Sequence, residues 1–245
     1  MRKRLDVLLV ERGLVPTRSR ARDLIKYGKV LVDARVCKKA GAEVGMEQVL
    51  ALEPGGAGGV SRAGAKLAAA LDAFGFDPEG RIALDVGAST GGFTEVLLQR
   101  GADNVFAVDV GRDQLHARLR ADPRVVSLEG CDARFLTRAL IPQPLDAIVA
   151  DVSFISLTKV LSAALTLAVP GAWLVALIKP QFEVGRARIG KRGIVRDASA
   201  RDAAVEEVTA WLAAQKSWRV AGIMPSPIRG GSGNEEYLIG ARKDG

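Results

Sequence analysis

The chain has 245 residues, of which 48% are hydrophobic and 26% charged, so it is long and apolar enough for one large domain or for a small and a medium one. Two cysteines without C-x-x-C spacing, Cys37 and Cys131, and a single histidine, His116, argue against a zinc site or a His-rich metal site. The net charge of +7 is concentrated at the start, because residues 1–50 hold twelve Lys or Arg against six Asp or Glu. This asymmetry favours a polyanion-binding module followed by a nearly neutral body.

A compact α+β unit is expected over residues 1–52. Apolar spacing and glycine stops define its helices, and short β-branched runs define its strands. The expected elements are a helix from Leu5 to Arg12 ended by Gly13, a helix capped by Thr17 or Ser19 and ended by Gly28, and strands at 30–33, 36 and 49–51, with a turn at Asp33-Ala34.

The second helix of this unit is strongly basic. Guanidinium groups suit phosphate oxygens, which predicts RNA contacts; the alternative is a merely solvated basic face. The predicted RNA-binding residues are Arg4, Arg18, Arg20, Arg22, Lys26 and Lys29. The unit resembles the S4 RNA-binding domain through Arg4-Leu-Asp6, Leu8, Gly13, Ser19-Arg-Ala-Arg-Asp-Leu-Ile25, Gly28-Lys-Val30 and Val32.

A glycine-rich linker is expected at 53–60, and a second domain at 61–245. Its strand and helix patterns alternate, which predicts a largely parallel sheet covered by helices. The expected elements are a leading helix from Ser61, strands near 82–87, 105–110, 125–129, 146–151 and 172–178, a helix from Leu157 to Val169, a helix from Ala198 to Gln215, and final strands at 219–224 and 236–240.

A run without charge, Val160–Ile178, reaches the usual length of a membrane span at 19 residues. Pro170-Gly171 interrupts it, because proline stops a helix and glycine favours a turn. We therefore expect a core helix followed by a buried strand rather than a membrane segment.

The segment Ile82–Thr94 is an apolar strand followed by glycines and the start of a helix. Its D-x-G-x-x-x-G-G spacing differs from a dinucleotide fingerprint and resembles motif I of S-adenosylmethionine (SAM) methyltransferases. The expected cofactor-binding residues of this loop are Asp85, Gly87, Ala88, Ser89, Thr90, Gly91, Gly92 and Phe93.

Three further aspartates stand at expected strand ends. Asp109 follows the loop by about 20 residues, where a carboxylate accepts ribose hydroxyl hydrogens, and Asp132 is placed to hold the adenine amino group. Asp151 completes the set. The alternative for Asp109 and Asp132 is a helix N-cap.

Asp151 and Lys179 end adjacent strands, which is a poor arrangement for stability alone. With Lys66 and Glu236 they form a Lys-Asp-Lys-Glu series that resembles the tetrad of FtsJ-like 2′-O-methyltransferases. Glu235 is the alternative fourth member, since adjacent strand residues face opposite sides.

Together with the S4-like unit, the chain resembles the TlyA (haemolysin A) family of ribosomal RNA methyltransferases. Further matching stretches are Ser61-Arg-Ala-Gly-Ala-Lys66, Lys179-Pro-Gln-Phe-Glu183, Gly193-Ile-Val195 and Gly233-Asn-Glu-Glu-Tyr237. The resemblance implies an α/β class I SAM-dependent methyltransferase domain, Rossmann-like with a seven-stranded sheet, behind a small α+β S4 domain.

The resemblance also implies the activity: SAM-dependent methylation of a ribose 2′-hydroxyl, at a cytidine in ribosomal RNA. Lys179 would be the base, Lys66 would supply a like charge and hold the target nucleotide, and Asp151 and Glu236 would orient the amines. Ribosomal RNA or ribosomal subunits are the expected partners, no metal is expected, and the oligomeric state stays open.

Two other functions are alternatives to this activity. A SAM-binding, RNA-binding assembly factor without catalysis is the main alternative, and the haemolysin name of the family suggests a membrane-lytic protein. The start of the chain lacks a secretory signal pattern, which predicts a cytoplasmic, reducing location. A basic loop, Gly185–Gly193, is expected either to clamp RNA phosphates or to be solvated.

Overall fold

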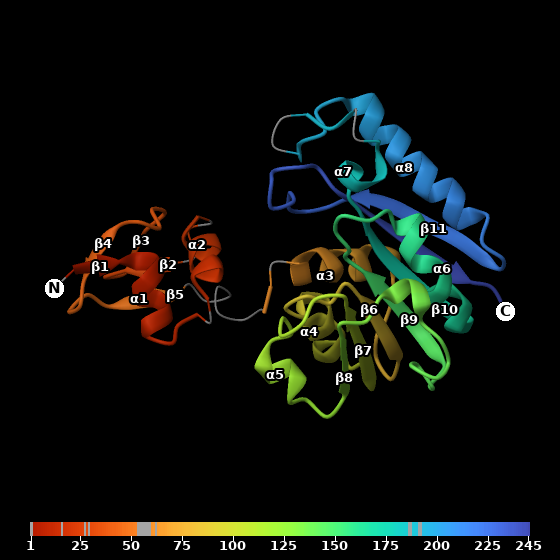
Figure 1. The fold of residues 1–245 in the computed structure, drawn as a ribbon, viewed down its shortest axis with the longest axis horizontal. Helices are drawn as coiled ribbons and strands as arrows, with labels where there is room; N and C mark the ends of the chain where they lie inside the picture. The colour runs from red at the N-terminus through yellow and green to blue at the C-terminus, as the bar shows by residue number, and fades with distance from the viewer. Residues whose placement is uncertain are drawn as a thin grey trace. The chain divides into compact units, whose positions relative to one another are not determined.

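The computed structural model divides the chain into two compact units, Met1–Val60 and Ser61–Gly245 (Figure 1). It describes residues 2–15, 17–26, 28, 30–52, 60–61, 63–185, 188–190 and 193–245, without the side chains of Ser19, Arg20 and Asp23. The expected linker, 53–60, lies outside the described residues except for Val60.

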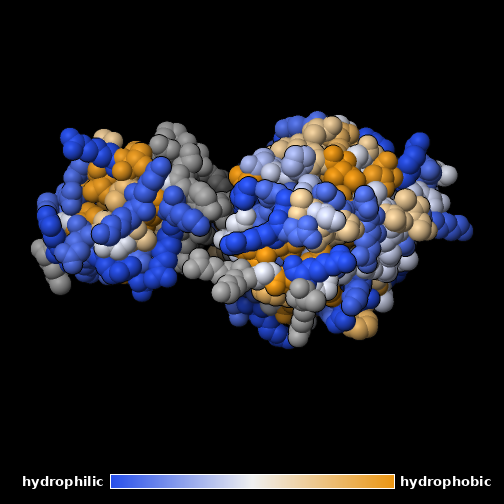
Figure 2. Space-filling model, turned by 90° about the horizontal axis from the view of Figure 1, so that it is seen from above, coloured by the Kyte–Doolittle hydropathy of each residue, from blue (hydrophilic) through white to orange (hydrophobic). Residues whose placement is uncertain are grey.

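The N-terminal unit packs two helices against short antiparallel strands. Its fully buried leucines and isoleucine lie on the inner sides of the helices. On the surface of this unit, Figure 2 shows hydrophilic residues around a small hydrophobic patch. The elements are α1 (Leu5–Glu11), α2 (Arg18–Lys26), a two-stranded sheet of β1 (Arg2–Arg4) and β4 (Glu43–Gly45), and a three-stranded sheet in the order β3 (Arg35–Val36), β2 (Val30–Val32), β5 (Leu50–Leu52).

Most of the expected N-terminal elements are present. Asp33 and Ala34 both have positive φ, as a two-residue hairpin turn requires. Thr17 immediately precedes α2, and Ser19 lies inside the helix. Of the two expected caps, Thr17 therefore stands at the N-cap position. The pairing of β1 with β4 was not expected, because neither segment alternates apolar with polar residues.

The C-terminal unit is built on a seven-stranded sheet in the order β11-β12-β10-β9-β6-β7-β8. The five strands β6 to β10 run parallel to one another. Strand β12 lies between β10 and β11 and is antiparallel to both. The strands are β6 (Ile82–Val86), β7 (Asn104–Asp109), β8 (Val125–Glu129), β9 (Leu145–Ala150), β10 (Ala168–Ile178), β11 (Trp218–Pro225) and β12 (Tyr237–Lys243). This arrangement confirms the expected class I methyltransferase fold.

Helices cover both faces of this sheet (Figure 1). On one face α3 packs with α4 and contacts β12, and on the other α6 contacts β10 and α8 contacts β11. The core between them holds buried leucines, valines and alanines of β6, β9 and β10, whose near-continuous apolar runs are typical of strands buried on both faces. The helices are α3 (Ala63–Phe74), α4 (Gly92–Gln99), α5 (Ala117–Arg120), η1 (Ala133–Phe135), α6 (Leu157–Leu167), α7 (Pro180–Glu183) and α8 (Ala198–Ala213).

One expected boundary is wrong. Pro170-Gly171 does not separate helix from strand, because α6 ends at Leu167 and β10 already begins at Ala168. The pairing of β10 with β9 shifts register between Ala168 and Trp173, and Pro170 and Gly171 lie exposed inside this irregularity. A bulge tolerates a proline because the missing N–H is not needed there.

Among the residues that the structure describes, no helix is both long and apolar enough to cross a membrane. The charge-free run Val160–Ile178 is divided between α6 and β10, as expected.

Candidate active site

The end of β6 is tied to the start of α4 by a buried carboxylate. Asp85 Oδ2 accepts hydrogen bonds from the Thr94 amide (2.8 Å) and the Thr94 hydroxyl (2.7 Å). Burial raises the pKa of Asp85 to about 7, the two bonds from Thr94 oppose the rise, and the charges of Asp151 and Asp109 add to it. Asp85 Oδ1 is buried without a hydrogen-bond partner among the described residues, so a polar atom is left unsatisfied behind the glycine loop.

The glycine loop brings two strand ends closer than any side chain would allow. Gly87 has φ +81°, and a Cβ placed on it would lie 2.7 Å from the carbonyl oxygen of Asp151. Gly91 (φ +96°) would clash with the side chain of Leu119, and Gly92 with that of Ser61. The loop therefore needs glycine for close packing as well as for its backbone conformation.

A cavity of about 560 Å³ opens where β6, β7, β8 and β9 end. This volume lies within the range of small-molecule sites. Its lining is Val86, Gly87, Ser89, Val108, Asp109, Val110, Gly111, Gln114, Cys131, Asp132, Ala133, Arg134, Asp151, Val152, Ser153, Phe154, Ile155 and Val160. Of the expected cofactor residues, the structure brings five to the cavity; the other six lie outside its lining, in β6 (Asp85), in the loop (Ala88, Thr90 and Gly91) and in α4 (Gly92 and Phe93).

The two downstream aspartates differ in their surroundings. Asp109 accepts hydrogen bonds from the backbone amides of Ser89 (2.8 Å, Oδ2) and Gly111 (2.7 Å, Oδ1), and each carboxylate oxygen keeps a second lone pair for a ligand hydroxyl. It caps no helix, since His116 is the N-cap of α5.

Asp132, in contrast, is the N-cap of η1. It accepts a hydrogen bond from the Arg134 amide (3.0 Å) and forms an ion pair with the guanidinium of the same residue (2.6 Å). The hydrogen bonds from Arg134 lower the pKa of Asp132. The capping alternative is thus realised at Asp132, which also lines the cavity.

Two lysine–carboxylate pairs stand at the ends of β9, β10 and β12. Lys179 Nζ lies 2.6 Å from Asp151 Oδ1 and donates a hydrogen bond to Ser153 Oγ at 2.9 Å. Lys66 Nζ lies 2.5 Å from Glu236 Oε2. The side chains of Lys66 and Lys179 are only 9% and 12% exposed, so both amines are held away from bulk water.

Strand register brings these residues from distant parts of the chain to one edge of the sheet. Ile178 pairs with Tyr237 in the antiparallel neighbour, so Lys179, which follows β10, and Glu236, which precedes β12, lie at the same end of adjacent strands. Asp151 follows the end of β9, the neighbour of β10 on its other side. Lys66 reaches the same edge from α3, which contacts β10 and β12.

The structure distinguishes the two glutamates that precede β12. Glu236, the candidate that the sequence motif favours, is 4% exposed and contacts Lys66. Glu235 is partly exposed and pairs instead with Arg229 (2.7 Å) and Arg201 (3.1 Å). Glu236 precedes β12 rather than lying inside it, which leaves its side chain at the strand end.

Two residues near the Lys179–Asp151 pair, Ser153 and Phe154, were not predicted from the sequence. Ser153 contacts Lys179, and Phe154 is 90% exposed at φ +67° with its ring 5.0 Å from that of Phe182. The only signal was their position directly after Asp151 at the end of a strand, where side chains of an open α/β sheet reach a ligand. Val110, Gln114 and Arg134, also at the cavity, follow the predicted aspartates in the same way.

The predicted RNA-binding residues are placed unevenly. Arg4, Arg18 and Arg22 converge on Asp6, and Lys26 is exposed at the end of α2. The side chain of Arg20, all of Lys29, and positions 186, 187, 191 and 192 of the basic loop lie outside the described residues.

Comparison with known proteins assigns both units. The FtsJ-like methyltransferase model matches residues 59–243, and the S4 domain model matches residues 3–50. The 16S/23S rRNA (cytidine-2′-O)-methyltransferase TlyA of Mycobacterium tuberculosis is 46% identical over 242 residues, which is 98% of this chain and 90% of the relative. The chain belongs to the TlyA family.

Other members carry a different description. Hemolysin A of Brachyspira hyodysenteriae is 38% identical over 96% of this chain and 98% of its own length. A Streptococcus thermophilus protein, solved as a candidate hemolysin, is 41% identical with a TM-score of 0.78, over 99% of this chain and 89% of that one. These two proteins thus match this chain over both of its units.

Proposed function

We propose that this TlyA family member transfers a methyl group from SAM to the ribose 2′-hydroxyl of a cytidine in ribosomal RNA. The observation that carries the proposal is the two nearly enclosed lysine–carboxylate contacts at the strand ends of the sheet, one of which includes Asp151 in the lining of a nucleoside-sized cavity. The family assignment and the activity named for the Mycobacterium tuberculosis relative support it.

The residues at the cavity fit the cofactor. Gly87 lines the cavity with backbone alone, and Asp109 keeps lone pairs for the ribose hydroxyls of the adenosine moiety. Behind this loop, Oδ1 of Asp85 is a buried polar atom without a partner among the described residues. When bound, SAM supplies an electrophilic methyl carbon, so the protein contributes alignment and a base.

Lys179 is the proposed base. A lysine amine acts as a base only after it has lost its own proton, so Lys179 must release one before it can accept one from the ribose. Asp151 lies 2.6 Å away and is the nearest acceptor. When RNA covers the site and excludes water, the neutral pair, with the proton on Asp151, becomes less costly to keep buried than two charges.

Lys66 has a different role in this scheme. Glu236 neutralises it at 2.5 Å, which weakens any like-charge effect on Lys179. Lys66 is therefore proposed to hold the target nucleotide, with Glu236 fixing its amine. The exposed ring of Phe154 offers a stacking surface for an RNA base next to the cavity.

Transfer of label from methyl-tritiated SAM tests the activity. Ribosomal subunits from cells that lack this gene are incubated with the purified protein, and radioactivity is counted in the RNA. Methyl transfer is expected, whereas retention of SAM and RNA without labelled product would identify a non-catalytic assembly factor.

A further inference from the structure

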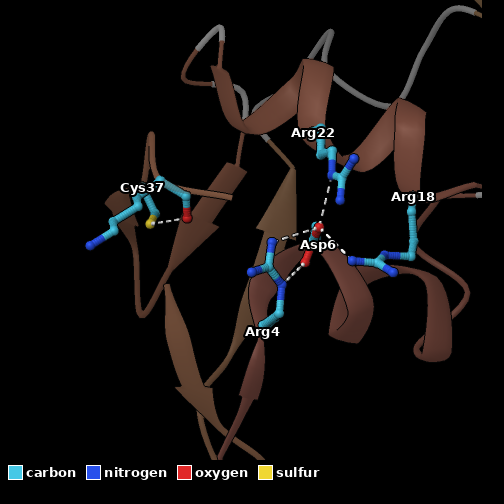
Figure 3. A network of polar contacts seen from close by, with 6 residues as sticks. Arg4, Asp6, Arg18, Arg22 and Cys37 are labelled. Carbon is cyan, nitrogen blue, oxygen red and sulfur yellow. Dashed lines mark hydrogen bonds and ion pairs between the residues drawn. The ribbon is translucent and has the colours of Figure 1, made fainter. Parts of the chain in front are cut away.

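The N-terminal unit contains a fully buried carboxylate surrounded by arginines. Asp6, in α1, is 0% exposed, and its two oxygens contact Arg4, Arg18 and Arg22 (Figure 3). The arginines come from the end of β1 and from two positions four residues apart on α2, so one side chain links three segments of the unit.

The contacts are ordered. Arg4 donates from Nε to Oδ1 (3.0 Å) and from Nη2 to Oδ2 (3.2 Å), which is the bidentate arrangement of a guanidinium on a carboxylate. Arg18 Nη2 (3.1 Å) and Arg22 Nε (3.0 Å) both donate to Oδ2. The hydrogen bond from Arg4 is the largest cause that lowers the pKa of Asp6 despite its burial, so Asp6 is ionised at any pH near neutrality.

The charges do not balance. Among the side chains that the structure describes, one carboxylate faces three guanidinium groups, which gives this cluster a net charge of about +2. The arginine side chains are 51%, 51% and 56% exposed, so each turns a large part of its surface to water while one edge is fixed on Asp6. A cluster that served stability alone would not gather three half-exposed cations around a single anion, because like charges repel.

We propose that Asp6 is a positioning residue that holds Arg4, Arg18 and Arg22 as one binding site for a backbone phosphodiester of the RNA. The inference rests on the proposed function, since the RNA is its substrate. A guanidinium that is already fixed loses less freedom when it binds a phosphate, so the site gains affinity from preorganisation as well as from charge.

Asp6→Asn tests the proposal by the sign of its effect. The substitution removes a negative charge from a basic unit, so electrostatics without positioning predicts tighter binding of RNA. The proposal predicts the opposite: the dissociation constant for ribosomal subunits from cells that lack the gene rises about tenfold, and the slope of log K against log salt flattens by roughly one. In methyl transfer KM rises while kcat at saturating RNA stays at the level of the unsubstituted protein.

Glu11→Gln is the matched control. Glu11 lies in the same helix, pairs with Lys3 at 2.7 Å and is 42% exposed, so the substitution removes the same charge without touching the arginines. Binding is expected to be unchanged or tighter.

Two more variants keep the test decisive if Asp6→Asn fails to fold. Arg18→Lys and Arg22→Lys keep the positive charge but lose the planar guanidinium group with its several donors. Each is expected to weaken RNA binding at an unchanged melting temperature. Binding as tight as that of the unsubstituted protein, by folded Asp6→Asn or by both lysine variants, overturns the proposal. A protein that binds RNA but transfers no methyl group would refute the proposed function, and the sign of the Asp6→Asn effect would still be readable.

Discussion

Lys179 and Lys66 show how residue type and burial together define this site. A lysine directly after an apolar strand could be an ordinary surface residue, but here both amines are nearly enclosed and each contacts a carboxylate. The motif predicted all four residues, and the structure places them at one sheet edge. The contact of Lys179 with Ser153 and the degree of burial of the four side chains depend on side-chain packing, which no sequence pattern reports.

Lys179→Ala is expected to lower kcat for methyl transfer by roughly 10²–10⁴-fold, because that is the usual contribution of a general base. SAM affinity, measured by calorimetry, should stay within about twofold, since Asp109 and the glycine loop are untouched. Lys216→Ala, at an exposed position, is the control. Full turnover by Lys179→Ala would exclude Lys179 as the base.

Asp85 gives the protein a stability that depends on pH. Its pKa rises from 3.8 to about 7 on folding, so between these values the folded state keeps a proton that the unfolded chain has released. The free energy of unfolding should therefore fall as pH increases through this range, by roughly 1 kcal/mol per unit. Asp85→Asn removes this dependence while keeping an acceptor for Thr94.

The measurement is urea unfolding of both proteins at pH 5, 6, 7 and 8, with Asp202→Asn, exposed on α8, as the control. The difference in stability should shift in favour of Asp85→Asn as pH increases. Parallel pH curves would show that Asp85 is ionised in the folded protein over the whole range.

At the scale of elements, the register of β12 decides which of two adjacent glutamates enters the site. Glu236→Gln leaves Lys66 buried without its counter-charge, so it should lower the free energy of unfolding by roughly 3 kcal/mol and reduce methyl transfer. Glu235→Gln should change stability by less than about 1 kcal/mol, because its ion pairs are half-exposed. A larger loss of stability in Glu235→Gln than in Glu236→Gln would contradict the assignment of Glu236 to the site.

Elements with strong periodic patterns were predictable, and elements that depend on tertiary pairing were not. The parallel strands β6 to β9 follow from apolar runs with an aspartate at or shortly after the strand end. The ribbon of β1 and β4 was missed because Arg2–Arg4 carries no apolar alternation and is a strand only through its partner. The boundary predicted at Pro170 was wrong for a similar reason. The proline lies in an irregularity of β10 that exists only through its pairing with β9.

At the scale of the whole molecule, charge and chemistry are divided between two units. The first fifty residues hold most of the excess positive charge, and the second unit holds the cavity and both lysine pairs. Composition alone indicated this division. The gathering of three arginines on one aspartate was not predictable, because residues at positions 4, 6, 18 and 22 meet only in the folded unit.

The most direct test of the central claim is the identity of the methylated nucleoside. RNA methylated by the purified protein is digested and its nucleosides are separated by mass spectrometry, with Lys179→Ala protein in parallel. The expected result is 2′-O-methylcytidine from the unsubstituted protein and none from Lys179→Ala. A methyl group on a base, or equal 2′-O-methylcytidine from both proteins, would contradict the account.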